Sequence, residues 1–85
     1  MTVKELVNIL SSNNIPLATR IVSDSGWECQ STECDGVYYY DDLYEGCVVL
    51  TQSYNKEEEE HYIYSKKERR YIKRICKAIR RKEYG

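Results

Sequence analysis

The sequence predicts a single α+β domain, built as a two-layer sandwich in which a small antiparallel sheet is covered on one face by two helices. Three observations support this fold class. An apolar stripe at helical spacing opens the chain, β-branched and aromatic runs fill its middle, and a strongly basic segment with a narrow apolar face closes it. A chain of 85 residues has room for one hydrophobic core, so we expect one domain over residues 1–85.

The first element is predicted to be a helix over residues 3–12. Thr2 and Glu5 have the spacing of a capping box, in which two side chains satisfy the free amides of a starting helix. Pro16 cannot continue a helix and marks its end. The apolar positions at i, i+3, i+4 and i+7, which the helix would bury, are Val3, Leu6, Val7 and Leu10.

Short β-branched and aromatic runs predict strands over residues 17–23, 37–40 and 47–52. The run 47–52 is apolar on both alternating faces, which indicates the central strand. Before it, Gly46 can supply the positive φ that many hairpin turns require. Residues 61–64 allow one further edge strand, so we expect a sheet of three to five strands.

The last element is predicted to be a basic helix over residues 66–83, because Ser65 and Glu68 form a second capping box. Its narrow apolar face would hold Ile72, Ile75, Cys76 and Ile79. Its opposite face would present six cations, Lys66, Arg70, Lys73, Arg74, Lys77 and Arg81. With both helices on one face of the sheet, the other face would expose tyrosines, which favours association, for example as a homodimer.

Charge is divided unevenly along the chain, although the formal net charge is only −1. Residues 65–85 contain ten Lys and Arg and two Glu, whereas residues 1–64 contain three Lys and Arg and twelve Asp and Glu. An acidic body followed by a basic segment predicts binding to a charged macromolecule. The same pattern also fits plain solvation of both surfaces, or a basic segment that lies against the acidic body and balances it.

No apolar run approaches the roughly 18 residues that a membrane span requires, and the first residues do not have a signal-peptide core. We therefore expect a cytoplasmic protein whose cysteines stay as thiols. Cys29 and Cys34 approach the pair spacing of a zinc site, but Cys47 and Cys76 lie in apolar runs and are expected to pack as small apolar side chains. We expect no metal and no cofactor.

Catalysis has weak support in the sequence. His61, the one histidine, lies beside the acidic run 57–60 and is the candidate base near neutral pH. A histidine among Tyr and Glu is more often a surface residue than a catalyst. The chain contains no nucleophile elbow, phosphate-binding loop or H-E-x-x-H motif, so we expect that it is not an enzyme.

Two surfaces remain as candidates for binding a partner. One is the cationic face of the predicted C-terminal helix, which would contact nucleic acid. The other is acidic and aromatic, so that tyrosines supply buried area and carboxylates imitate a phosphate backbone toward a protein partner. This second set comprises Tyr38, Tyr40, Asp41, Asp42, Tyr44 and Glu45.

Roughly residues 1–52 contain a series of short motifs: Met1–Leu6, Ile15–Leu17, Gly26–Glu28, and Gly36–Tyr39 followed by Val48–Thr51. This plan resembles small proteins carried by bacterial phages and prophages, a group that includes anti-CRISPR and other anti-defence inhibitors. The resemblance implies a non-enzymatic protein that inhibits a host defence protein or ribonucleoprotein, such as a CRISPR effector, by occluding a surface. A small DNA- or RNA-binding regulator that uses the basic helix is the alternative. The group shares no motif, so no residue role follows from the resemblance.

Overall fold

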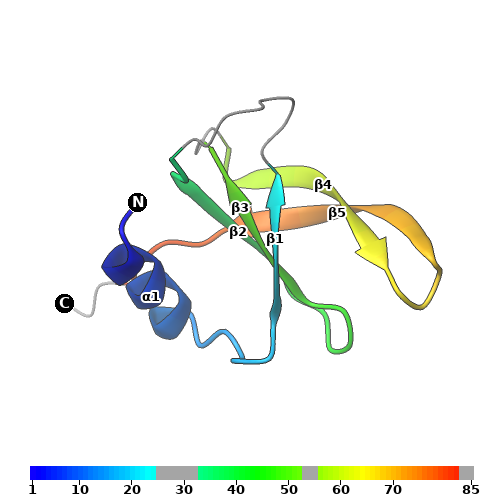
Figure 1. Ribbon diagram of the computed structural model, residues 1–85, viewed down its shortest axis with the longest axis horizontal. Coiled ribbons are helices and arrows are strands. Elements are labelled where there is room, and N and C mark those ends of the chain that lie inside the picture. The colour runs from blue at the N-terminus through cyan, green and yellow to red at the C-terminus, as the bar shows by residue number, and fades with distance from the viewer. Residues whose placement is uncertain (25–32, 53–55, 83–85) are drawn as a thin grey trace.

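Five strands and one helix form the part of the chain that the computed structural model describes, which is residues 1–24, 33–52 and 56–82 (Figure 1). The predicted Gly26–Glu28 turn and Cys29 lie outside these ranges. The elements are α1 (Val3–Ser12), β1 (Arg20–Asp24), β2 (Gly36–Tyr40), β3 (Cys47–Thr51), β4 (Glu58–Ser65) and β5 (Arg70–Ala78).

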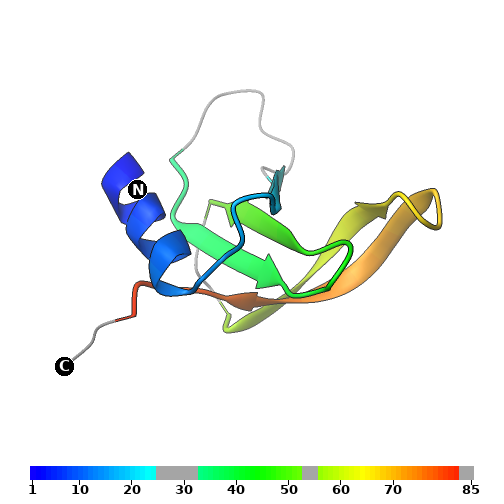
Figure 2. The same cartoon turned by 90° about the horizontal axis from the view of Figure 1, so that it is seen from below.

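The strands form one mixed sheet in the order β1-β3-β2-β5-β4. β1 runs parallel to β3, and the other neighbouring pairs are antiparallel. β2 meets β5 near the C-terminal end of β5, where Tyr38 lies opposite Ala78 and Tyr39 opposite Lys77. The β4–β5 hairpin therefore projects from the body of the molecule, on the side away from α1 (Figure 1, Figure 2).

The predicted fold class is wrong at the C-terminus, because the segment expected to form a helix over residues 66–83 contains strand β5 instead. β5 pairs with β4 along its length, from Glu58 opposite Lys77 to Ser65 opposite Arg70. This places the acidic run beside the basic segment, and opposite charges on neighbouring strands stabilise such a pairing. The fold is a curled, mostly β structure with one short helix, and not a sheet flanked by two helices.

Burial along β5 follows the two-residue period of a strand. Cys76 is buried and Ile72 and Arg74 are partly buried, whereas Tyr71 and Ile75 are exposed. A helix would have placed Ile72, Ile75 and Cys76 on one apolar face. The strand instead directs Ile75 to the side opposite Cys76, because successive side chains alternate across a sheet.

One hydrogen bond of the predicted second capping box is present, but it closes a hairpin turn. The backbone N–H of Glu68 donates to Ser65 Oγ at 3.2 Å, which is the bond expected at the start of a helix. The chain then turns through Lys66–Arg69 and reverses into β5. Arg69 has a φ of 56°, a left-handed conformation that helical residues do not adopt. The same hydrogen bond is therefore compatible with either structure.

Replacing Arg69 with glycine is expected to raise the free energy of unfolding by about 0.5 kcal/mol. Glycine relieves a left-handed strain of about 1–2 kcal/mol, and the extra chain entropy that it loses on folding is about 0.4–1 kcal/mol. Urea denaturation measures the difference. Lys67→Gly is the matched control, because Lys67 does not have a positive φ and should lose stability. A loss of stability in Arg69→Gly as large as in the control would contradict the turn geometry.

One core lies between α1 and the sheet. Ile9 of α1 is buried with Val37, Val48 and Ile79. The helix begins where the capping box predicts, with the N–H of Glu5 donating to Thr2 Oγ1 at 3.1 Å. The predicted apolar stripe is partly wrong. Leu6 and Leu10 pack against this core together with Ile9, whereas Val3 and Val7 are exposed.

A second core lies on the opposite face, inside the curl of the sheet. It contains Tyr38, Cys47, Val49, Ile63 and Cys76, all buried. The sheet face that was predicted to be exposed is therefore buried, because the sheet curls over it. Burial raises the pKa of the Cys47 thiol and raises that of Cys76 to about 11, so both thiols pack as neutral apolar groups in the core.

Candidate functional site

The outward side of the β4–β5 hairpin is covered neither by α1 nor by the curl of the sheet. Large side chains lie exposed on it, with Tyr62 67%, Tyr71 69% and Ile75 58% accessible to solvent. Tyr64 is also exposed, at 41%. We call this surface the hairpin face, and it comprises Tyr62, Tyr64, Tyr71, Lys73 and Ile75.

Cross-strand pairing holds the rings of the hairpin face in place. Tyr64 lies opposite Tyr71, and the ring centroids are 5.4 Å apart in an edge-to-face arrangement. Tyr62 lies opposite Lys73, whose Nζ is 5.7 Å from the Tyr62 ring centroid and 3.3 Å from Glu60 Oε2. The bond to Glu60 raises the pKa of Lys73. The face is thus aromatic and locally neutral, with a paired charge at its margin.

The hairpin turn adds a group of exposed cations next to this face. We call this group the cationic turn, and it comprises Lys66, Lys67, Arg69 and Arg70. Glu68 is the acid within it and lies 3.8 Å from Arg70 Nε. Ser65 alone separates Tyr64 from the turn, and Arg70 directly precedes Tyr71, so positive charge and exposed rings lie side by side at the far end of the hairpin.

Glu45, from the loop between β2 and β3, holds the cationic turn in position. Its carboxylate accepts a hydrogen bond from Ser65 Oγ at 2.8 Å and from the N–H of Lys67 at 3.1 Å. Arg74 Nη2 lies 3.9 Å away from the same carboxylate. The N–H of Lys67 and the Ser65 hydroxyl lower the pKa of Glu45. The loop between β2 and β3 is therefore bound to the turn of the β4–β5 hairpin, although the two are distant in the sequence.

Because the pKa of Glu45 is lower in the folded protein than its ordinary value of 4.5, this carboxylate stabilises the fold above that pH. The contribution is lost as the pH falls through the folded pKa. We expect the unfolding free energy of the wild type to fall more steeply below about pH 4.5 than that of Glu45→Gln, whose neutral amide does not titrate. Urea denaturation at about pH 7 and about pH 3 compares them. Equal acid sensitivity in both proteins would contradict this role.

The acidic set predicted to bind a partner is largely used inside the protein. Tyr38 is fully buried, and its hydroxyl donates to the Lys56 carbonyl at 2.7 Å. Tyr40 is partly buried under the Arg74 guanidinium, which lies 5.1 Å from its ring centroid. Like Glu45, these two tyrosines make structural contacts. Asp41 and Tyr44 are exposed, Tyr44 at 89%.

Asp42 is exposed, but it shapes its own loop. Its Oδ1 accepts hydrogen bonds from the N–H groups of Tyr44 and Glu45, both at 2.8 Å, and these bonds lower its pKa. The loop also requires a glycine at position 46, because a Cβ there would lie 2.9 Å from the Asp42 carbonyl oxygen. Close backbone approach therefore explains this glycine, and not the positive φ that the sequence suggested.

The six cations predicted to share one helix face are separated by the strand. Arg74 points inward, whereas Lys73 and Lys77 point outward. Lys66 and Arg70 belong to the cationic turn, and Arg81 is exposed beyond β5. The sequence interpretation missed the exposed rings at 62, 64 and 71. The signal in the sequence is the period-2 placement of Tyr62 and Tyr64 between His61, Ile63 and Ser65, which are the residues that the strand buries.

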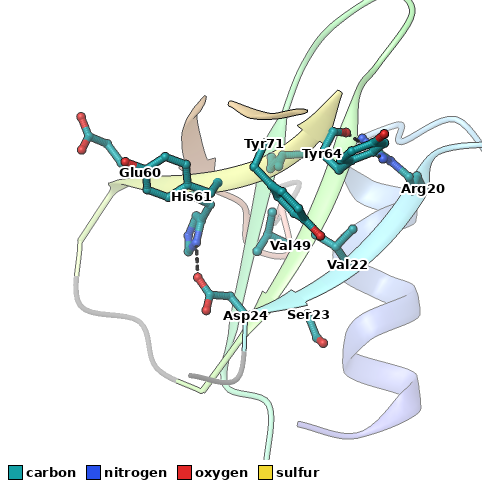
Figure 3. Close-up of a pocket in the computed structure, with 11 residues that line it drawn as sticks. Arg20, Val22, Ser23, Asp24, Val49, Glu60, His61, Tyr64 and Tyr71 are labelled. Atoms are coloured by element: carbon teal, nitrogen blue, oxygen red, sulfur yellow. Dashed lines mark hydrogen bonds and ion pairs between the residues drawn. The ribbon is translucent and has the colours of Figure 1, made fainter. Parts of the chain in front are cut away.

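The two edge strands of the sheet, β1 and β4, approach each other across a cavity of about 430 Å3 (Figure 3). His61 bridges them and is buried, contrary to the expectation of a surface histidine. Its Nδ1 lies 2.7 Å from Asp24 Oδ2, and its Nε2 lies 3.2 Å from Glu59 Oε2. Farther along, Arg20 Nη1 donates to the Tyr64 carbonyl at 3.1 Å. We call this cavity the wedge.

Comparison with known protein families, curated proteins and solved structures found no match to this chain. The resemblance to small phage proteins therefore stays a prediction. Within residues 1–24, 33–52 and 56–82, no group of three or more His, Cys, Asp or Glu side chains is placed to hold a metal ion. In the same residues, no helix is long and apolar enough to cross a membrane.

Proposed function

We propose that this protein is a non-enzymatic binding protein that uses its projecting hairpin to bind single-stranded nucleic acid. The observation that carries the proposal is the exposed pair of Tyr64 and Tyr71 next to the cationic turn. Proteins that bind single strands combine cations that follow the backbone with aromatic rings on which bases stack. This hairpin presents both on one element.

The charges around the hairpin support this ligand. The cationic turn can contact phosphates, and each neutralised phosphate releases counterions. The acidic run at the other end of the hairpin is partly neutralised, because Glu60 pairs with Lys73 and Glu57 lies 3.0 Å from Arg80 Nη2. A strand bound across Tyr64 and Tyr71 would therefore meet net positive charge at the turn, with its bases over the rings.

A second function, inhibition of a protein partner of the anti-defence type, has its own supporting observation. In the loop between β2 and β3, Leu43 and Tyr44 are 87% and 89% exposed. Asp41 lies beside them and is also exposed. An exposed apolar and aromatic tip beside one exposed acid can anchor a host protein. Since the neighbouring carboxylates already serve the fold, this surface is smaller than the acidic set that the sequence suggested.

Fluorescence anisotropy with labelled single strands of about ten nucleotides tests the first function. We expect binding at low salt, an affinity that falls steeply as salt rises, and a loss of about tenfold or more in Tyr64→Ala/Tyr71→Ala, because stacking contributes about 1–3 kcal/mol per base. Tyr44→Ala is the control, since it removes a tyrosine that is even more exposed, at 89%, and lies outside the hairpin face.

Two results would reject nucleic-acid binding. One is an anisotropy that does not change with protein concentration at low salt. The other is an equal loss of affinity in the double variant and the control. If, in addition, a pull-down from bacterial lysate recovered a protein that survives nuclease treatment and is lost in Tyr44→Ala, the second function would replace the first.

A further inference from the structure

The wedge opens beside the hairpin face and shares residues with it. Tyr62, Tyr64 and Tyr71 line the cavity from the side of the hairpin. In Figure 3 the Tyr71 ring reaches from β5 toward Val22 of β1, across the mouth of the wedge. A chain lying on the tyrosines could therefore place one of its groups in the cavity without leaving the hairpin.

The walls of the wedge differ in chemistry. Val22, Val49 and Ile63 form an apolar floor. Asp24 stands at one end, where His61 binds one carboxylate oxygen and leaves the side chain 53% exposed. A planar apolar body with hydrogen-bond donors on one edge matches such a site, because ligand pockets combine apolar walls with a few placed polar groups.

We propose that the wedge receives one base of the bound strand and that Asp24 makes it prefer guanine. The inference rests on the proposed binding of single-stranded nucleic acid. Guanine presents two adjacent donors, N1–H and the N2 amino group, on its Watson–Crick edge, and a carboxylate accepts both at once. Adenine and cytosine have one amino group as the donor on this edge, and thymine and uracil have one N–H. None of these bases offers two adjacent donors. Reading a splayed base on its Watson–Crick edge is the usual route to sequence preference in single strands.

His61 positions Asp24 for this role. The carboxylate can only accept a hydrogen bond, so the imidazole N–H at Nδ1 donates to it across 2.7 Å. His61 is itself held by burial and by the Tyr38 ring, whose centroid is 5.6 Å from its own. Arg20 lines the other end of the cavity, where Nη1 donates to the Tyr64 carbonyl, and the remaining N–H groups of its guanidinium can contact the phosphate of the inserted nucleotide.

The test compares oligothymidylates of about ten nucleotides that differ at one central base, which is thymine, cytosine, adenine or guanine. We expect the guanine strand to bind about tenfold more tightly than the others, in the range of one bidentate base contact. In Asp24→Asn this preference should disappear, so that the four strands bind with similar affinities. Glu58→Gln, an exposed acid on the same hairpin that does not line the wedge, should keep the preference.

The outcomes separate this inference from the function on which it rests. Equal affinity of the wild type for all four strands, or an unchanged guanine preference in Asp24→Asn, would overturn the guanine site and leave nucleic-acid binding intact. Absence of binding to every strand would overturn both. The wild-type series needs no variant, so a loss of folding in Asp24→Asn does not affect the first comparison.

Discussion

Tyr38→Ala is expected to lower the free energy of unfolding by about 3–5 kcal/mol, as other large-to-small substitutions of buried aromatic residues do. The Tyr38 side chain is fully buried inside the curl and packs with Val49 and Cys76. Its removal leaves a cavity in a small core, and it also leaves the Lys56 carbonyl without the hydroxyl that now donates to it. Urea denaturation measures the loss.

Tyr44→Ala is the control for this prediction, because it makes the same chemical change at a ring that is 89% exposed. We expect a change within about 0.5 kcal/mol there. If Tyr38→Ala does not fold, Tyr38→Phe keeps the ring and removes only the hydroxyl, with an expected loss of about 1 kcal/mol. Equal stability changes at Tyr38 and Tyr44 would show that the sheet does not close over Tyr38.

Reversing three charges of the cationic turn, in Lys66→Glu/Lys67→Glu/Arg70→Glu, is expected to lower the affinity for single strands at low salt by about a hundredfold or more. The variant loses three phosphate contacts and adds repulsion at the same positions. The dependence of affinity on salt should become shallower, because fewer counterions are released. Anisotropy titrations at several salt concentrations measure both effects.

The matched control moves the same charge change to the body of the protein, in Lys4→Glu/Lys56→Glu/Arg81→Glu. These three side chains are exposed and lie outside the cationic turn. We expect an affinity within a few-fold of the wild type, through the weak long-range effect of net charge. An equal loss in both variants would assign the binding to overall charge and not to the hairpin.

The N-terminal half of the fold could be read from the sequence because its signals are local. Thr2 caps α1 as predicted by accepting from the N–H of Glu5, whereas the Glu5 carboxylate accepts from the Thr2 hydroxyl. The runs at 37–40 and 47–52 correspond closely to β2 and β3, in which burial is nearly continuous. The runs at 17–23 and 61–64 are strands with different limits, Arg20–Asp24 and Glu58–Ser65.

The C-terminal segment could not be read in this way, because its two periodicities compete. Ile72, Ile75 and Cys76 fit a helix, and the strand period is hidden because its inward position 74 is an arginine. That arginine is tolerated inside because its guanidinium stacks on Tyr40 and lies near Glu45. The choice of strand depends on pairing with β4, which is a contact between separate segments that no local pattern displays.

The candidate site also depends on contacts between separate segments, which the sequence does not display. Tyrosines belong to the set of residues that the sequence suggested for binding, but which tyrosines are exposed depends on the curl of the sheet. Tyr38 lies at its centre, whereas Tyr64 and Tyr71 lie on its outside. The wedge was out of reach of the sequence for the same reason, because Asp24 and His61 meet only when β1 and β4 are brought together across the sheet.

The parallel pairing of β1 with β3 has a consequence for the order of folding. The β2–β3 and β4–β5 pairs join strands that are neighbours in the chain, so they close short loops and can form early. β1 can add only after β3 has found its place, and it then becomes an edge held by one neighbour and a few side chains. We expect the amide protons of β1 to gain protection last in pulse-labelled refolding and to exchange first from the native state. Local opening of β1 in the native state would also open the wedge, while the β4–β5 hairpin stays intact.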